Sequence, residues 1–380
     1  MSEDSEQSGL EEYRASFDGE PGYLDWAAFG PLSPAVRTEL HADAELLGSG
    51  RRSGIAMVEA RVDEARSLLA ELLSVAADEV TLQPSTSYGL AQAIYGLDGG
   101  VVVGRRDYPA LTVTVARAAA ARGLVQPQVI DSEDGRITPE AVREALTDET
   151  RAVAVSLVDF RTGFRADLAA LRDVIGEDRL LIVDAIQGFG VVDVDYRAAD
   201  VVCAHGYKWL RAGRGTGFAW FSPRARERIE PVLSGFAGMD AEGFTDTIER
   251  PAAGARAFTV TEADSLAAAR LATALRGVRD AGVPAIAAEV AERAGDIMFF
   301  ADRYEIPVAT PREPERRAGI VALQPRPQDV APLAASLANH GLTVTARGDM
   351  IRVATHVGTD ADTLRLFGDA LAAFSYARVW

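Results

Sequence analysis

Short apolar runs alternate with helical segments along most of the chain, and this alternation limits the folds that the chain can adopt. A parallel connection between two strands needs a crossover of about a dozen residues or more, which a helix commonly supplies. Strands that alternate with helices are therefore typical of an α/β fold, with a mostly parallel sheet covered on both faces. The expected strands of this sheet are residues 80–82, 101–103, 128–130, 152–158, 180–183, 201–204 and 217–221.

The pattern changes after a glycine-rich stretch at residues 235–254. Long helices are expected there, and short strands then mix with helices, which predicts a second, smaller α+β domain. The expected elements are helices near 266–280, 286–304, 330–340 and 360–374, and strands at 306–309, 319–323, 342–345 and 351–354. We expect an N-terminal arm, mobile or clasping a partner, before a large domain and a small C-terminal domain. Their predicted bounds are 1–22, 23–255 and 256–380.

The composition limits the partners of the chain. Its 56 acidic residues outnumber 39 basic ones, and the net charge of −17 argues against nucleic acid or an anionic membrane as main partner. An anionic small ligand would need a locally basic pocket. One cysteine excludes an intrachain disulfide, and four scattered histidines argue against a metal centre. The first twelve residues are acidic and polar, unlike a signal peptide, so we expect a cytoplasmic protein.

Lys208 is the only lysine in the chain, because 38 of the 39 basic residues are arginine. Arginine serves wherever a positive charge suffices, but its guanidinium stays protonated in proteins. Only a lysine offers a side-chain amine that can lose its proton and attack a carbonyl, as in a Schiff base. Taken alone, the residue fits that role or a surface ion pair equally well.

Polar residues at neighbouring strand ends favour the first role. Asp184 follows the apolar run 180–183, and Lys208 comes 24 residues later, just after the next expected strand. In open parallel sheets, ligands bind beyond the carboxyl ends of the strands. A carboxylate just past a buried strand is costly without a cationic partner, such as a protonated pyridine nitrogen. Ser85 and Thr86 lie between a strand and a helix, where they could hold a phosphate or simply cap the helix.

The segments Asp184-Ala-Ile-Gln187 and His205-Gly-Tyr-Lys208-Trp-Leu resemble those of the class V aminotransferases. These are pyridoxal-phosphate enzymes with an aspartate-aminotransferase-like fold, and they include cysteine desulfurases, kynureninases and isopenicillin-N-epimerase-like proteins. The resemblance covers about residues 23–374. Supporting similarities are Tyr23-Leu-Asp, Thr162-Gly163, Gly213-Arg-Gly-Thr-Gly217 and Ile351-Arg352-Val353.

The resemblance implies a set of site residues. Lys208 would form a Schiff base with pyridoxal 5′-phosphate, Asp184 would hold the pyridinium nitrogen, and Gln187 the phenolic oxygen. Tyr108 would stack on the ring face, and Arg352 would bind the substrate carboxylate. Thr261 would reach a phosphate across a dimer interface. The phosphate of the same subunit would be bound by Ser85, Thr86, His205 and Tyr207. The resemblance also implies a homodimer that shares its sites between subunits.

Four of these residues have structural alternatives that the sequence leaves open. Tyr108 could belong to the core, Gln187 could cap a loop, and Arg352 could form a surface ion pair. His205 could be a core histidine bonded to the backbone, which is nearly as common as a phosphate ligand.

The reaction is narrowed by one departure from the family. Desulfurases need a cysteine on the loop before the carboxylate arginine, whereas residues 346–350 contain none, and Cys203 is expected to be a packed residue. We therefore favour transamination of an amino acid, with a C–S lyase or epimerase as the alternative. A non-catalytic binding protein on the same fold is a remote alternative, because such copies usually lose the lysine or the aspartate.

Overall fold

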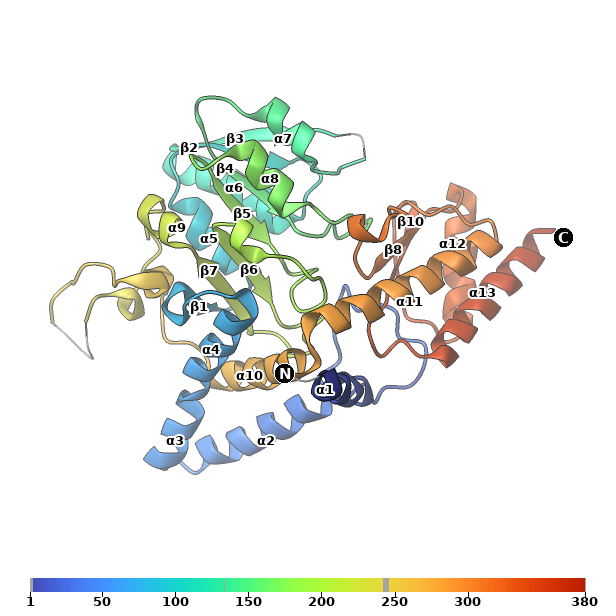
Figure 1. Cartoon of the computed structure of the whole chain (residues 1–380), viewed down its shortest axis with the longest axis horizontal. Helices are drawn as coiled ribbons and strands as arrows, with labels where there is room; N and C mark the ends of the chain where they lie inside the picture. Colours follow the sequence, from blue (N-terminus) through green and yellow to red (C-terminus); the bar gives the residue numbers. More distant parts are fainter. Residues whose placement is uncertain (1–2, 133, 242–245, 380) are drawn as a thin grey trace.

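The computed structural model describes residues 3–132, 134–241 and 246–379, which form two domains, each with its own sheet (Figure 1). The large domain contains a seven-stranded sheet in the order β1-β7-β6-β5-β4-β2-β3. Strands β3, β2, β4, β5 and β6 run parallel, and β7 is antiparallel to both β6 and β1. The expected α/β fold with a mostly parallel sheet is confirmed. The strands are β1 Val80–Gln83, β2 Gly99–Gly104, β3 Val125–Ile130, β4 Thr150–Ser156, β5 Leu180–Asp184, β6 Val201–His205 and β7 Gly217–Phe221.

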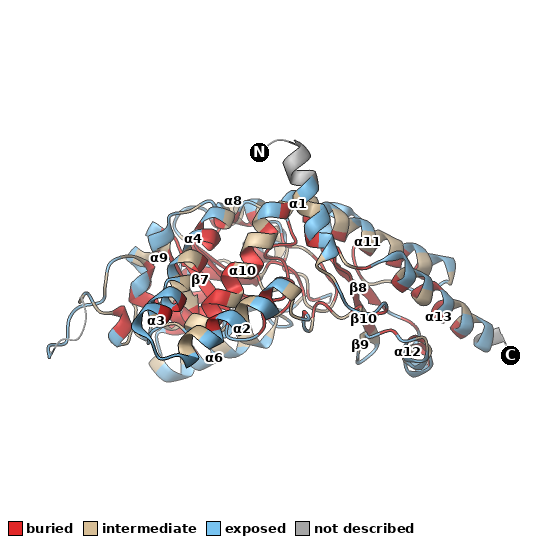
Figure 2. Ribbon diagram, turned by 90° about the horizontal axis from the view of Figure 1, so that it is seen from below, coloured by how far each residue is buried: buried red, intermediate tan, exposed pale blue. Residues whose placement is uncertain are grey.

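Both faces of this sheet are buried under helices. Along β5, Leu181 and Val183 belong to one apolar cluster, while Leu180 and Ile182 belong to another on the opposite face. The strand therefore reads as a continuous apolar run, as expected for a sheet covered on both sides. Figure 2 shows the buried residues concentrated on the strands and on the helix faces turned toward them. The helices of this domain are α2 Pro34–Gly48, α3 Arg52–Glu59, α4 Arg61–Leu73, α5 Thr86–Tyr95, α6 Pro109–Arg122, α7 Pro139–Ala145, α8 Leu168–Ile175 and α9 Pro223–Arg228.

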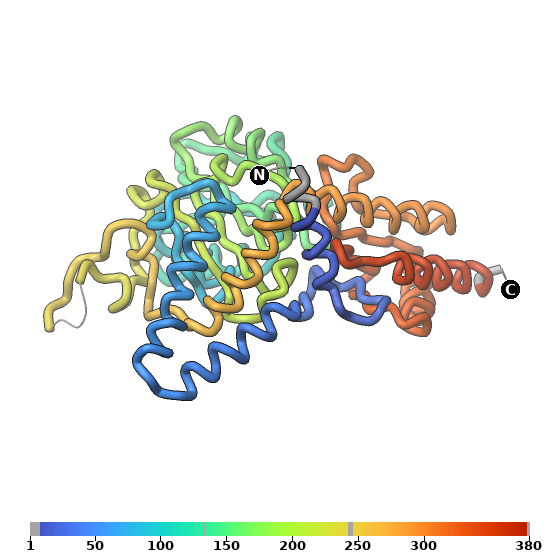
Figure 3. The backbone as a smooth tube through the Cα atoms, turned by 60° about the horizontal axis from the view of Figure 1, so that its bottom comes forward, coloured from blue at the N-terminus to red at the C-terminus, as the bar shows by residue number. Residues whose placement is uncertain are grey.

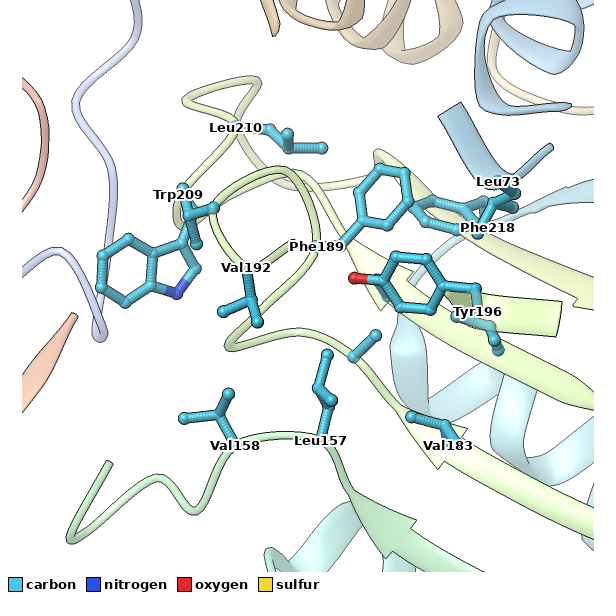
Figure 4. Packing of buried hydrophobic residues seen from close by; sticks show 14 of the residues in the cluster. Leu73, Leu157, Val158, Val183, Phe189, Val192, Tyr196, Trp209, Leu210 and Phe218 are labelled. Carbon is cyan, nitrogen blue, oxygen red and sulfur yellow. The ribbon is translucent and has the colours of Figure 1, made fainter. Parts of the chain in front are cut away.

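Aromatic packing fixes the segment that follows β5. Phe189 lies edge-on against Phe218 of β7, with their ring centroids 4.7 Å apart (Figure 4). The ring of Tyr196 also packs on Phe189, with the centroids 5.7 Å apart. This packing holds the chain immediately after Asp184, so the end of β5 is rigidly placed.

The small domain has a three-stranded antiparallel sheet in the order β8-β10-β9, with strands β8 Ile320–Leu323, β9 Thr345–Arg347 and β10 Met350–Ala354. Its helices are α11 Val283–Arg303, α12 Val330–Asn339 and α13 Ala361–Val379. The strand expected at 306–309 is wrong, because Pro307 has no N–H for a ladder and only Val308 bridges to β8. The strand expected at 342–345 is also displaced, since Thr343 pairs with Tyr23 and β9 begins only at Thr345.

Helix α10 Ser265–Ala281 lies beyond the expected domain boundary at residue 255, yet it packs against α2 and α4 of the large domain (Figure 1). The domain bounds stay a prediction. Helix α11 then runs on from α10 into the small domain. Six short 3-10 helices complete the described structure, at Ala77–Glu79, Tyr196–Ala198, Phe236–Gly238, Gly254–Phe258, Pro314–Arg316 and Pro327–Asp329.

The N-terminal segment folds back onto its own chain. Helix α1 Glu3–Ala15 packs on α10 (Figure 3), and the side chain of Arg211 donates to the carbonyl of Ser16 at 2.7 Å and of Pro31 at 3.2 Å. The described part of the expected N-terminal arm thus packs on its own chain, and its role toward a partner stays a prediction; residues 1–2 lie outside the described residues. None of the described helices is long and apolar enough to cross a membrane.

A buried carboxylate ties the strands together at the edge opposite their carboxyl ends. Asp200, which is 1% exposed, accepts from the backbone N–H of Leu181 at 2.8 Å and from Arg224 Nε at 2.7 Å, and it also pairs with Arg172. A buried charge with several donors is costly to disrupt, because its partners are left unpaired.

We expect Asp200→Ala to lower the free energy of unfolding by about 3–5 kcal/mol, because two arginines and a backbone N–H lose their acceptor. Urea unfolding followed by tryptophan fluorescence measures this change. The control is Asp131→Ala, which removes an exposed pair with Arg105 and should cost less than about 1 kcal/mol. Equal losses in the two variants would contradict the role assigned to Asp200.

Candidate active site

The predicted site residues meet at the carboxyl ends of the central strands. Asp184 is the last residue of β5, His205 is the last residue of β6, and Lys208 follows three residues later. Tyr108 precedes the first residue of α6, and its ring centroid lies 5.6 Å from Lys208 Nζ. The ring of Tyr108 therefore lies close to the amine, which is the position expected for a side chain that stacks on a cofactor ring bound to that amine.

Asp184 and Lys208 are both buried, with 1% and 4% exposure. Burial raises the pKa of the Asp184 carboxyl well above its usual range, against the opposing effects of a hydrogen bond from Ile186 N and the charge of Lys208. Burial likewise lowers the pKa of the Lys208 amine, while the charge of Asp184 opposes this. Each group is thus shifted toward its neutral form, which makes the amine a better nucleophile near neutral pH.

The turn between β1 and α5 forms a second part of the site. Ser85 caps α5, and its hydroxyl accepts from the backbone N–H of Tyr88. Gly217, the first residue of β7, lies against this turn, because a Cβ there would be 2.6 Å from Ser85 Cα. The close approach brings the first turn of α5 beside the end of β6, where His205 is found. Burial, followed by the charges of Arg214, Lys208 and Arg270, lowers the pKa of His205 to about 4, so the imidazole is neutral at pH 7.

Three buried polar atoms in this region have no partner within the described chain: Asp184 Oδ2, Thr86 Oγ1 and His205 Nε2. Buried polar atoms are nearly always hydrogen-bonded in native proteins, so each one calls for a ligand or a water. A protonated pyridine nitrogen would satisfy the carboxylate oxygen, and phosphate oxygens would accept from the hydroxyl and an imidazole N–H. These residues therefore fit pyridoxal 5′-phosphate.

Gln187 is buried, and its amide already joins two other segments. Its Nε2 donates to the carbonyl of Ala27 at 3.0 Å, and its Oε1 accepts from Trp209 Nε1 at 2.9 Å. One amide N–H remains for a phenolic oxygen. The side chain therefore fixes the position of two other segments, which is the structural role that the sequence left open. Its contact with the cofactor stays a prediction.

Arg352 on β10 faces the large domain across the interface. Its Nη1 donates to the carbonyl of Phe160 at 3.0 Å, and its Nη2 lies 3.3 Å from Asp25. Its Nε is buried and without a partner. The arginine is thus oriented by one carboxylate and still has a donor free for a substrate carboxylate, rather than being an ordinary surface ion pair.

The sequence prediction missed the residues that position Arg352. Both carboxylate oxygens of Asp25 accept from the hydroxyl of Thr345 at 2.8 Å, and Thr345 lies opposite Arg352 in the β9–β10 ladder. The only signal was the Tyr23-Leu-Asp25 segment, which matched the family pattern without a stated role. Phe160 was also missed; its ring lies edge-on to Tyr108, with centroids 5.1 Å apart.

The structure places the other two predicted phosphate ligands differently. Thr261 is exposed and lines a separate cavity of about 470 Å³ together with Pro84 and Tyr88. Tyr207 lies within the site, because its ring centroid is 5.6 Å from Lys208 Nζ and 4.6 Å from that of His205. Arg214 also lies over the Tyr207 ring, at 4.5 Å. Their roles stay predictions. Cys203 is fully buried in the apolar cluster beneath α5, which confirms that it is a packed residue.

A buried acid and an amine at adjacent strand ends, beside an aromatic ring and two buried polar atoms without a hydrogen-bond partner, fit pyridoxal 5′-phosphate. A family model described as aminotransferase class-V matches residues 23–366. The chain therefore belongs to the class V aminotransferase family, and it is a pyridoxal-phosphate-dependent enzyme.

Individual relatives differ in their described activities. The chain is 26% identical over 320 residues to an uncharacterized aminotransferase of Bacillus subtilis, YcbU, which covers 82% of this chain and 84% of that protein. It is 30% identical over 281 residues to kynureninase of Deinococcus radiodurans, covering 69% and 67%. The apo structure of a cysteine desulfurase from Thermococcus onnurineus has the same fold, with a TM-score of 0.85 at 18% identity over 97% of this chain and 98% of that one.

In the cofactor-free protein, we expect Lys208 to titrate below the ordinary lysine value of about 10.4, because burial penalises its charged form. Asp184→Asn should lower the pKa further, since the carboxylate stabilises the ammonium. Reductive ¹³C-methylation gives one lysine resonance per chain, whose NMR shift can be followed with pH. Asp195→Asn is the control and should leave the titration unchanged. A wild-type value near 10.4 would contradict the assignment.

Proposed function

We propose that this enzyme transfers the amino group of an α-amino acid to a keto acid. The observation that carries the proposal is the unpartnered Oδ2 of Asp184 beside the buried amine of Lys208, with Arg352 oriented toward the same region. The absence of cysteine in residues 346–350 argues against desulfuration, and the similarity to YcbU supports transamination.

The cofactor supplies an aldehyde that condenses with primary amines and a protonated ring that withdraws electrons from the substrate Cα. In this proposal, Asp184 keeps the ring nitrogen protonated, because its buried carboxylate is stable only beside a positive charge. Lys208 would hold the cofactor covalently. When free, its amine would take the proton from the substrate Cα and return it, and its lowered pKa suits this role near neutral pH.

Arg352 orients the amino acid. Its fork of N–H donors can hold an α-carboxylate, which leaves the amino group directed toward the large domain and Lys208. Asp25 and Thr345 act as positioning residues, since they fix the guanidinium before substrate binds. We also propose that the protein is a cytoplasmic homodimer in which Thr261 of each subunit reaches the other subunit's phosphate.

Lys208→Ala should abolish covalent retention of the cofactor after borohydride reduction, because no other lysine exists in the chain. Intact-mass spectrometry measures the retained cofactor. The matched control is Arg214→Ala, which removes a nearby cation but not the amine, and it should still retain cofactor. Retention by Lys208→Ala would disprove the covalent assignment.

The reaction type is tested by mixing the yellow holoenzyme with a panel of amino acids, without any keto acid. A transaminase should lose its visible band lastingly, because the enzyme would retain the amino group until a keto acid is added. Recovery of the band while the amino acid is consumed indicates a lyase. Recovery with inversion of the amino acid indicates an epimerase. Either recovery would overturn transamination and leave the site assignment standing.

A further inference from the structure

An arginine-lined cavity opens beside the proposed substrate site. Its volume is about 570 Å³, and residues of both domains line it. Five arginines and two aspartates contribute to its wall, although acidic residues outnumber basic ones 56 to 39 in the whole chain. The cavity is therefore a local reversal of the overall charge, and it is the kind of basic pocket that an anionic ligand requires.

The cavity adjoins the reactive amine through an aromatic wall. Lys208 does not line it, but Arg352 does, and Phe160 in its wall contacts Tyr108. The guanidinium carbons of Arg161 and Arg347 lie 5.5 and 5.8 Å from the centroid of the Phe160 ring. A substrate held by Arg352 can thus extend along Phe160 toward these two arginines.

Most of the arginines already have an acidic partner. Arg161 binds Asp159 through Nε and Nη2, Arg136 lies 3.3 Å from Asp134, and Arg352 is oriented by Asp25. Arg347 differs from them, because its side chain makes no hydrogen bond or ion pair with any described residue. It is also exposed, so it can meet a ligand without first breaking a hydrogen bond or an ion pair.

The strand register places Arg347 and Arg352 on one face of the hairpin. Thr345 lies directly opposite Arg352, and Arg347 comes two residues after Thr345 on the same strand. Side chains two residues apart in a strand share a face, and diagonal cross-strand neighbours have their Cα atoms roughly 7–8 Å apart. The two guanidinium groups can therefore hold two anionic groups of one small molecule.

We propose that the enzyme acts on amino acids whose side chain ends in an anion, with Arg352 binding the α-carboxylate and Arg347 the distal group. The proposal rests on the proposed function and specifies its substrate class. The distal group is a carboxylate or a phosphate, both of which arginine binds through charge-assisted hydrogen bonds. Arg347 is the specificity-determining residue, and Phe160 supports the aliphatic part of the side chain.

The first test measures binding to the holoenzyme without any reaction. Glutarate carries two carboxylates and pentanoate carries one on the same number of carbons, and neither has an amine. By calorimetry, Arg347→Ala and Arg347→Gln should each weaken glutarate binding about 10-fold or more and change pentanoate binding less than about 2-fold. Arg352→Ala should weaken both ligands. The control Arg365→Ala removes an exposed arginine from α13 and should change neither.

The second test compares isosteric amino acids by their effect on the visible band of the holoenzyme. Glutamate and aspartate should bind more tightly than glutamine and asparagine, and Arg347→Gln should remove this preference. A stronger preference for O-phosphoserine over serine would identify phosphate as the distal group. Equal affinities for glutamate and glutamine, with no effect of Arg347→Gln, would overturn the inference while the proposed function stands. If no amino acid alters the band but glutarate binding still depends on Arg347, the proposed function fails and the anion site remains.

Discussion

The site depends on two opposite charges that are buried at neighbouring strand ends without touching. Asp184 and Lys208 are almost fully buried, and among the described ion pairs they do not form one. Each is therefore destabilised in its charged form by the loss of water. A ligand that brings a protonated ring nitrogen to the carboxylate and takes the amine into a covalent bond relieves both penalties at once. The parallel sheet is what makes this arrangement rigid, because β5 and β6 are fixed side by side and covered on both faces.

Much of this arrangement could be predicted from the sequence, because strand ends are visible there. The apolar runs at 180–183 and 201–204 located Asp184 and Lys208, and helix-cap chemistry located Ser85 and Thr86. In these cases the residue ends or closely follows a buried strand, or lies at the start of a helix, so local sequence determines its place. The lone lysine added a chemical reason for choosing this edge of the sheet.

Other features depend on contacts between distant segments and could not be predicted in this way. Asp25 reaches Thr345 and Arg352 only because the chain near Tyr23 pairs with the small domain. Only the register of β9 and β10 places Arg347 on the same face as Arg352. The pairing of Thr343 with Tyr23 also displaced the strand expected at 342–345. The N-terminal helix likewise packs on α10, more than 250 residues away, which no local pattern indicates.

The candidate site is divided between two domains. This division separates the distance of a bound molecule from the amine from the selection of that molecule by its length. Lys208 belongs to the large domain, whereas Arg347 and Arg352 belong to one small sheet in the other domain. If the small domain rotated as a rigid body about α11, the distance from the amine to both arginines would change. It would leave the spacing between the two arginines unchanged. Domain orientation would then govern how closely a bound molecule approaches the amine, while the hairpin alone would determine which length of molecule is held.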